Sequence, residues 1–289
     1  MQTILSHNII NSLRCPQCEQ ESRINRRDDE NNHEYFCPHC QFFYTNKSNT
    51  FMKHSKISYL ALLMLIKYYI ADFSPKKVYL ILFFKGIDIS LKTIHVYYKK
   101  IMLIKNNYVK NEMRNCILGG PVEIDESMIY KTKRGINRRG RIGLIRMWLF
   151  GLKCRNSGRI ILYPVLKRTK VKLLLIILRH VRRGALIYSD CWSAYVNIHV
   201  TPKQSFLRPF GFYHLFVNHD YQFVSEVFPD THINGIERVW KSFNRYIREF
   251  QPRKFLDHYI SKFYMNRNFR NPKDQFELII QLLAIQRNN

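Results

Sequence analysis

Acidic residues are scarce in this chain. It contains 21 Asp and Glu residues against 47 Lys and Arg residues, and its formal net charge is +26. A balance this basic is rare among metabolic enzymes and typical of proteins that bind a polyanion such as nucleic acid. The same scarcity makes every acidic residue inside an apolar run conspicuous, because few acids are available for ordinary surface positions.

Long apolar runs and a secretion signal are also lacking. The most apolar segment, Tyr59–Ile70, contains Lys67 and falls short of the roughly 18 residues that a membrane-spanning helix requires. The first residues show no basic start, apolar run and small-residue cleavage site. We therefore expect an intracellular protein with no membrane partner, cytoplasmic in a bacterial host and nuclear in a eukaryotic one. Cysteines in such compartments act as thiols or metal ligands rather than as disulfides.

Two Cys-x-x-Cys pairs stand near the start of the chain, Cys15 with Cys18 and Cys37 with Cys40. Each pair can place two thiolates on one tight turn, and two such turns make a closed tetrahedral zinc site. Two matched copies favour this zinc ribbon over a redox role. Because four cysteines leave no open coordination position, the zinc predicted in residues 1–50 is structural.

Short helices are predicted in residues 51–112. Apolar positions recur at helical spacing in Ser58–Ile70, Pro75–Phe84 and Ser90–Leu103, and Ser90 is a suitable N-cap. The last helix carries polar and basic residues, namely Lys92, Thr93, His95, Tyr97, Lys99 and Lys100. Two short helices joined by a glycine turn suit a helix-turn-helix that binds DNA. A plain helical linker would give the same pattern.

From residue 113 onward the pattern predicts an α/β domain. Strands are expected at Pro121–Tyr130, Leu144–Cys154, Gly158–Leu166, Ala185–Tyr188 and Tyr213–Asn218, and helices at Lys170–Val181, Ile233–Phe250 and Phe255–Phe269. Three meandering strands followed by helix, strand, strand and helix indicate a mixed sheet with helices on its faces.

Two aspartates stand at the ends of predicted strands. Asp125 lies in an alternating strand, and Asp190 follows the apolar run 185–188. A carboxylate at the end of a buried strand is costly unless a cation meets it, and a divalent cation is the simplest partner. A strand-end aspartate that caps a turn is the alternative. Glu123 and Glu126 flank Asp125 but point elsewhere by strand alternation or lie beyond it, so neither is assigned to the site.

The helix predicted at Ile233–Phe250 presents two different sides. Its core face comprises Ile236, Val239, Trp240, Phe243, Tyr246, Ile247 and Phe250. Asn234, Glu237 and Lys241 lie together on another side, where they offer an amide, a carboxylate and an ammonium. Glu237 and Lys241 alone would be an ordinary surface pair. Beside Asp125 and Asp190 they favour a metal site for phosphoryl transfer.

A run of six basic residues follows the first predicted strand: Lys131, Lys133, Arg134, Arg138, Arg139 and Arg141. Its proximity to Asp125 in the sequence favours a hairpin that binds DNA phosphates beside the site, whereas a solvated loop is the plain alternative. Lys167, Arg168, Lys170 and Lys172 would extend this basic surface.

Four motifs together resemble the DDE transposases of the Merlin / ISXO-like insertion-sequence group. They are Glu-Ile-Asp-Glu at 123–126, Ser-Asp-Cys-Trp-Ser-Ala-Tyr at 189–195, Val-Asn-His at 217–219 and His-Ile-Asn-Gly-Ile-Glu-Arg-Val-Trp-Lys at 232–241. Each motif is weak alone, but they are specific in combination, and the resemblance covers nearly the whole chain. It implies an RNase H-like five-stranded core over 113–289 that binds two Mg²⁺ or Mn²⁺ ions.

The resemblance assigns the metal-binding residues by position. The first carboxylate falls on Asp125 and the second on Asp190, and the third is either Asn234 or Glu237. Asn234 stands seven residues before Lys241, the spacing expected for the basic partner. Glu237 is the stronger ligand for a hard cation.

The implied activity is cut-and-paste DNA transposition by two-metal-ion hydrolysis and strand transfer. The ribbon and the helices would bind the terminal inverted repeats of double-stranded DNA, and the need to pair two ends implies a homodimer or larger assembly. The alternative is a domesticated or decayed copy that binds DNA without cutting it, which would be compatible with Asn234 as the third residue. A nuclease or resolvase with the same core would not need two N-terminal DNA-binding modules.

Overall fold

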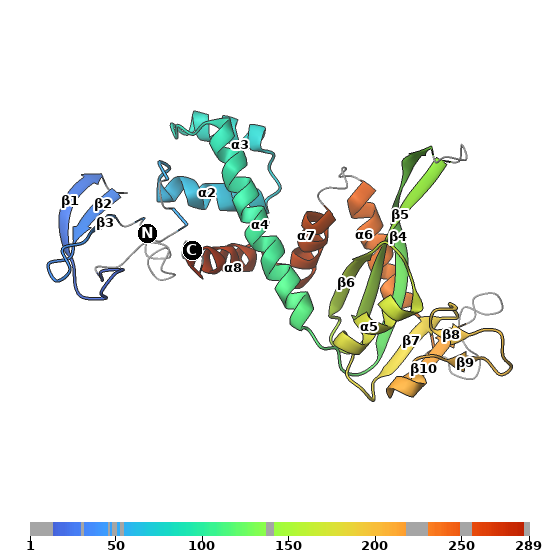
Figure 1. Ribbon diagram of the computed structural model, residues 1–289. Helices are drawn as coiled ribbons and strands as arrows, with labels where there is room; N and C mark the ends of the chain where they lie inside the picture. Colours follow the sequence, from blue (N-terminus) through green and yellow to red (C-terminus); the bar gives the residue numbers. More distant parts are fainter. Residues whose placement is uncertain are drawn as a thin grey trace. The chain divides into compact units, whose positions relative to one another are not determined.

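The computed structural model describes residues 14–29, 32–45, 47, 51–52, 55–136, 142–217, 231–248 and 256–285. Two compact units make up the chain (Figure 1). The first comprises Met1–Val109 together with Met265–Asn289, and the second comprises Lys110–Tyr264.

The first unit begins with a small antiparallel sheet of three strands, β1 (Arg23–Asp29), β2 (Asn32–Phe36) and β3 (Phe43–Thr45). One cysteine pair precedes β1, and the other lies on the turn between β2 and β3. Tyr35 and Tyr44 stack with their ring centroids 5.1 Å apart and complete a core that otherwise consists of the four cysteines. So small an apolar core is typical of a module that depends on a metal for its stability.

Four helices form the rest of the first unit: α2 (Tyr59–Ile70), α3 (Pro75–Phe84), α4 (Leu91–Asn115, which continues into the second unit) and α8 (Pro272–Ile285). Ser58, Ser74 and Ser90 cap α2, α3 and α4, each accepting a hydrogen bond from an N–H three residues further on. The common core contains Leu62, Leu65, Ile66, Val78, Leu82, Ile94, Ile101, Ile279, Ile280 and Leu283. Tyr97, expected on the DNA-binding face, is buried and hydrogen-bonded to Ser55.

Two features of this unit differ from expectation. Helix α4 does not end at Leu103, because buried apolar residues continue at helical spacing to Met113. The expected boundary at residue 112 therefore lies inside a helix. Helix α8 was not expected, and its contacts with α2 place residues 265–289 with the first unit rather than with the catalytic segment 113–289.

The second unit contains a five-stranded mixed sheet. Its strands are β4 (Val122–Ile136), β5 (Ile142–Cys154), β6 (Ile160–Val165), β7 (Leu186–Asp190) and β10 (Tyr213–Val217), in the order β10-β7-β4-β5-β6. The first three form an antiparallel meander, β7 runs parallel to β4, and β10 runs parallel to β7. This is the RNase H-like arrangement that the family resemblance implied. Strands β8 (Val196–Asn197) and β9 (Gln204–Ser205) form a separate small hairpin.

Helices α5 (Lys170–His180) and α6 (Asn234–Arg248) cover the faces of the sheet, and α7 (Leu256–Asn268) packs on α6, where the rings of Phe263 and Phe243 have their centroids 5.1 Å apart. Helix α6 packs on β4 and β5, and it meets the face to which Asp125 points. His180 on α5 hydrogen-bonds to Tyr163 on β6. Tyr163 is level with Glu126 across the paired positions of β4, β5 and β6, so both side chains point to the face away from Asp125. Because neighbouring residues alternate between faces, α5 and α6 cover opposite sides.

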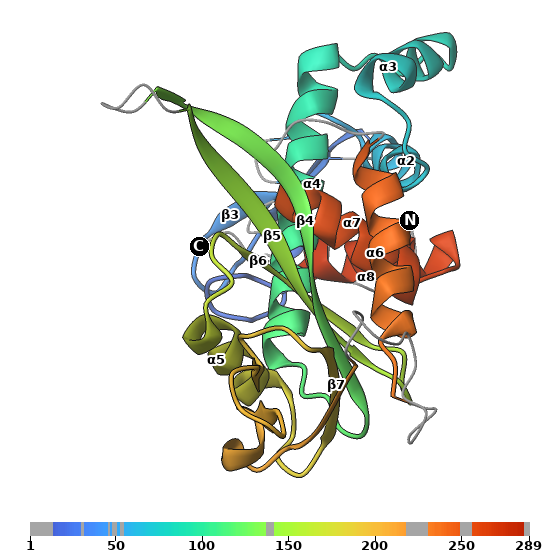
Figure 2. The same cartoon turned by 90° about the vertical axis from the view of Figure 1, so that its right-hand side faces the viewer.

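Strands β4 and β5 continue as a two-stranded arm beyond the rest of the sheet (Figure 2). Strand β6 pairs with β5 only over Trp148–Lys153, whereas β4 and β5 pair out to Ile136 and Ile142. The first predicted strand therefore extends past Tyr130 and takes the backbone of Lys131, Lys133 and Arg134 into the arm. The other three members of the basic run, Arg138, Arg139 and Arg141, lie outside the described residues.

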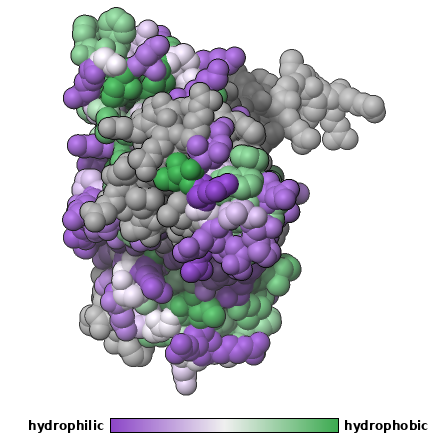
Figure 3. Space-filling view, turned by 90° about the vertical axis from the view of Figure 1, so that its left-hand side faces the viewer, coloured by the Kyte–Doolittle hydropathy of each residue, from purple (hydrophilic) through white to green (hydrophobic). Residues whose placement is uncertain are grey.

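The face drawn in Figure 3 shows hydrophilic side chains over much of its described surface, with smaller hydrophobic patches between them. Within the described part of the chain, none of the helices has the length and apolar character needed to cross a bilayer.

Candidate active site

The register of the sheet brings Asp125 and Asp190 together. Strands β4 and β7 are parallel neighbours, with Glu123 paired to Tyr188. The same register two residues further on makes Asp125 level with Asp190, the last residue of β7. Because level residues on adjacent strands point to the same face, both carboxylates lie on one side of the sheet.

Helix α6 lies along this side and is bonded to alternate residues of β4. Three contacts, spaced one helical turn apart on α6, run from the Ile236 N–H to Glu123 Oε2 (2.6 Å), from Trp240 Nε1 to Asp125 Oδ2 (2.9 Å) and from Asn244 Nδ2 to Ser127 Oγ (3.3 Å). Every second residue of the strand therefore lies opposite a residue one turn further along the helix, and this holds over two turns. This match fixes the helix beside Asp125.

Two glycines allow α6 to approach the sheet so closely. A Cβ at Gly151 would lie 2.5 Å from Cη2 of Trp240. A Cβ at Gly235 would collide with the carboxylate of Glu123 and the ammonium of Lys153. The glycine of the His-Ile-Asn-Gly-Ile-Glu motif is thus required by packing.

Glu123 anchors the start of α6. Its buried carboxylate forms an ion pair with Arg155 Nε at 2.8 Å and accepts the Ile236 N–H at the first turn of α6. The guanidinium of Arg155 also lies 3.8 Å from the ring centroid of Tyr188 and donates to the carbonyl of His232. The sequence pattern did not assign Glu123 to the site. An acid in a buried strand nevertheless indicates that a cationic partner lies near it.

The electrostatics of Asp125 show which acids lie close to it. Burial raises the pKa of Asp125, and the charges of Asp190 and Glu237 raise it further, to about 7. Hydrogen bonds from the Glu126 N–H and from Trp240 act in the opposite direction. Asp125 is therefore a buried carboxyl group with two further acids, Asp190 and Glu237, in its surroundings.

The two candidates for the third ligand differ in position. Glu237 lies in the first turn of α6, is partly buried and acts on Asp125. Asn234 is the first residue of α6 and is exposed, as is Lys241 one turn beyond Glu237. Glu237 is thus the less exposed of the two candidates and the one that carries a negative charge.

Glu126 lies on the opposite face, in a contact network that sequence analysis missed. The Tyr195 hydroxyl donates to one of its oxygens, and Arg168 Nη1 lies 3.4 Å from the other. Burial, Asp125 and Asp190 raise the pKa of Glu126 to about 8, and Arg168 opposes this shift. Arg168 had been expected among the DNA-binding cations, but it is turned toward Glu126 and away from solvent.

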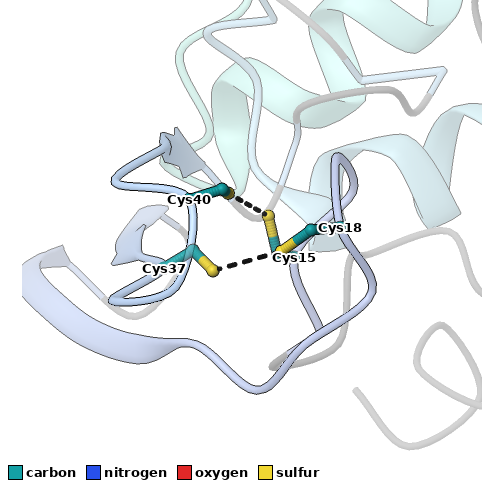
Figure 4. Close-up of side chains that lie close together, drawn as sticks. All are labelled: Cys15, Cys18, Cys37 and Cys40. Carbon is teal, nitrogen blue, oxygen red and sulfur yellow. Dashed lines mark hydrogen bonds between the residues drawn. The ribbon is translucent and has the colours of Figure 1, made fainter.

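The four N-terminal cysteines meet as predicted (Figure 4). Their Sγ atoms all lie within 4.8 Å of one another, and 3.5 Å separates Cys15 from Cys40 and Cys18 from Cys37. The Cys40 N–H is the main cause that lowers the pKa of Cys37 to about 6, whereas burial is the main cause that raises the pKa of Cys40 to about 12. Four sulfurs at these separations fit tetrahedral Zn²⁺. Among the described side chains, this is the only group of three or more His, Cys, Asp or Glu residues gathered so tightly.

The fold and the acids define the class, an RNase H-like core of the DDE type. The model of the ISXO2-like transposase domain family matches residues 117–268, more than half of the chain, and the chain belongs to this family. It is accordingly an enzyme of the polynucleotidyl transferase type. None of the curated proteins matches the chain.

Three solved structures with low similarity are retroviral. The HTLV-2 integrase catalytic core with magnesium is 15% identical, with a TM-score of 0.33 over 54% of this chain and 88% of that one. The BIV integrase catalytic core is 12% identical, with a TM-score of 0.32 over 55% and 93%. The simian T-cell lymphotropic virus intasome is 13% identical, with a TM-score of 0.34 over 55% and 51%.

Proposed function

We propose that this transposase cuts DNA at terminal inverted repeats and joins the freed ends to target DNA, with Asp125, Asp190 and Glu237 as the ligands of two Mg²⁺ or Mn²⁺ ions. The observations that carry the proposal are the shared face of Asp125 and Asp190 on neighbouring strands and the place of Glu237 in the first turn of the helix that packs on that face. Carboxylates gathered on one face favour a divalent cation, because the cation offsets their repulsion. Carboxylate oxygens are also the ligands that Mg²⁺ prefers.

Residues of the chain orient these ligands. Trp240 holds one oxygen of Asp125, and the backbone N–H of Trp192 holds one oxygen of Asp190 at 3.2 Å. Glu237 is carried by a helix whose start is fixed by Glu123. Asp125, Asp190 and Glu237 would hold the ions, whose chemistry would be to lower the pKa of a water and to stabilise a leaving 3′ oxygen. Lys241, exposed one turn from Glu237, is suited to contact a DNA phosphate.

The DNA-binding part of the proposal rests on charge and on the N-terminal modules. The net charge of +26 favours a polyanion. The basic run on the β4–β5 arm would contact phosphates near the site, and the zinc ribbon with α3 and α4 would recognise the inverted repeats. On α4, Lys92, His95 and Lys99 are exposed and available for that contact. Pairing of two ends would require a homodimer or larger assembly.

Cleavage of a duplex that carries the element's own inverted repeat tests the proposal. We expect nicking at the repeat boundary that depends on Mg²⁺ or Mn²⁺, is abolished by Asp125→Asn and Asp190→Asn, and leaves end binding intact in both variants. Cleavage that persists in Asp190→Asn would contradict the metal site. Tight end binding without cleavage by the unmodified protein would favour the decayed copy.

Glu237→Gln and Asn234→Ala, measured side by side, identify the third ligand. We expect Glu237→Gln to abolish cleavage and Asn234→Ala to retain most of it, because the acid lies close enough to act on Asp125 whereas Asn234 is exposed. The reverse pattern would assign the third position to Asn234.

A further inference from the structure

Arg168 links the two strand ends that carry the candidate metal ligands. It lies in the loop between β6 and α5, and its guanidinium lies over two indole rings. The Arg168 Cζ atom is 3.5 Å from the ring centroid of Trp148 and 4.1 Å from that of Trp192. The side chain is only 22% exposed, so the positive charge is held mostly away from solvent.

One end of this link reaches β4. Arg168 Nη1 lies 3.4 Å from Glu126 Oε2, and the Glu126 side chain is 3% exposed. The other oxygen of Glu126 accepts the Tyr195 hydroxyl. Glu126 is the immediate neighbour of Asp125, and its N–H donates to Asp125 Oδ1 at 2.7 Å. Fixing Glu126 therefore fixes the backbone from which Asp125 projects.

The other end reaches β7. The indole of Trp192 stacks on Arg168, while the backbone N–H of Trp192 donates to Asp190 Oδ1 at 3.2 Å. Holding the Trp192 ring thus holds the peptide that orients Asp190. Trp192 and Tyr195 both belong to the motif that follows Asp190. Neither is a proposed metal ligand, and their contacts with Arg168 and Glu126 give them a role.

A guanidinium is suited to this position for a physical reason. Its planar face can stack on aromatic rings while its edge donates hydrogen bonds to a carboxylate. An ammonium is a point charge and cannot stack on an indole face in the same way. The contacts of Arg168 therefore depend on shape as well as on charge.

We infer that Arg168 is a positioning residue that sets the spacing between Asp125 and Asp190 from the face of the sheet opposite the metal ions. The inference rests on the proposed function, because it concerns the metal ligands of that site. Groups behind a metal's ligands commonly change metal affinity by about 10–100-fold when they are removed.

Calorimetric Mn²⁺ binding to the zinc-loaded full chain, together with cleavage of the inverted-repeat duplex, tests this role. We expect Arg168→Ala to weaken Mn²⁺ binding by about tenfold or more, and Arg168→Lys to recover only part of the loss. Addition of methylguanidinium should restore metal affinity to Arg168→Ala but not to Asp190→Asn. Arg179→Ala is the matched control, since Arg179 is an exposed arginine on α5, and it should leave Mn²⁺ binding unchanged.

Thermal unfolding separates positioning from stability, and Arg168→Lys serves as the test variant should Arg168→Ala not fold. Unaltered Mn²⁺ affinity in a folded Arg168 variant, with the unmodified protein binding Mn²⁺ normally, would overturn the positioning role and leave the proposed function standing. Absence of Mn²⁺ binding and of cleavage in the unmodified protein would overturn the proposed function itself. The two failures are therefore distinguishable.

Discussion

Trp240 belongs both to the core of the catalytic unit and to its candidate site. Its ring is 6% exposed and packs directly over Gly151, while its indole N–H donates to Asp125. A buried indole N–H needs an acceptor. Here the acceptor is a proposed metal ligand, so the packing of one aromatic ring also sets the orientation of the carboxylate.

Gly151→Ala should disturb this arrangement. The added methyl would lie 2.5 Å from Cη2 of Trp240, so the ring must move and its hydrogen bond to Asp125 must change. We expect a stability loss of about 1–3 kcal/mol by urea unfolding. Cleavage should fall by on the order of a hundredfold. Gly119→Ala is the control, because its methyl would lie 3.8 Å from Arg182, an ordinary contact. Equal effects of the two substitutions would contradict this account.

His214 is held neutral between two serines. Its Nε2 is 2.9 Å from Ser189 Oγ, and its Nδ1 is 2.7 Å from Ser205 Oγ. Burial is the main cause, and Arg208 a second, that lowers the pKa of His214 from 6.5 to about 3. The contacts tie β7 and β10 to the β8–β9 hairpin. These residues support the strand that ends at Asp190.

Because His214 is held neutral, we expect the free energy of unfolding to fall in acid. Above the unfolded pKa both states are neutral, but as the pH falls from about 6.5 toward 3 only the unfolded chain takes up the proton. The loss should reach about 2 kcal/mol near pH 5. His214→Gln should flatten this dependence in urea unfolding measured at several pH values. The exposed His199→Gln should not change it, and an unchanged slope in His214→Gln would refute the assignment.

At the scale of elements, the start of α6 depends on a buried ion pair. Glu123→Gln would leave the Arg155 guanidinium without its partner carboxylate on the buried side of β4. Breaking such a pair from one side costs about 3–5 kcal/mol. We expect a stability loss of that order, measured by urea unfolding, and a loss of cleavage because Glu237 is displaced with the helix.

Glu237→Gln provides the contrast for this prediction. Glu237 is only partly buried, so its substitution should abolish cleavage while stability stays nearly unchanged. A Glu237→Gln variant as unstable as Glu123→Gln would mean that both residues act through the fold.

Signals within short stretches of sequence predicted several helices and one cap correctly. Pro75–Phe84 was predicted with the bounds that α3 has, and Ser90 caps α4 as expected. These correct element predictions depend only on alternation, spacing and capping within short windows. The same signals singled out Asp125, Asp190 and the alternatives Asn234 and Glu237, whose metal-binding role stays a prediction.

The contacts between distant segments were not predictable in the same way. Nothing near Glu123 in the sequence indicates that its carboxylate meets the first turn of α6, more than a hundred residues later. The basic character of Arg168 suggested DNA, but its partners Trp148, Trp192 and Glu126 come from three other segments. Such pairings follow from sheet register and helix docking, which one sequence does not specify locally.

At the scale of the whole molecule, the two units should respond differently to loss of zinc. Cys37→Ser removes one of four ligands, and the ribbon has little core besides the cysteines, Tyr35 and Tyr44. We expect loss of bound zinc, unfolding of the ribbon and weaker end binding. Unfolding of the catalytic unit, followed by hydrogen exchange in β4 and β7, should stay as in the unmodified protein. Retained zinc in Cys37→Ser would contradict the four-cysteine site.

The return of the chain in α8 has a consequence for how a gene of this kind decays. Helix α8 supplies Ile279, Ile280 and Leu283 to the core of the first unit. A premature stop codon just before it would still encode every proposed metal ligand, and yet it would leave α2 and its neighbours with an open apolar surface. A copy damaged near its last codons would then first lose recognition of its own ends. Its catalytic centre would stay intact but would no longer be directed to those ends.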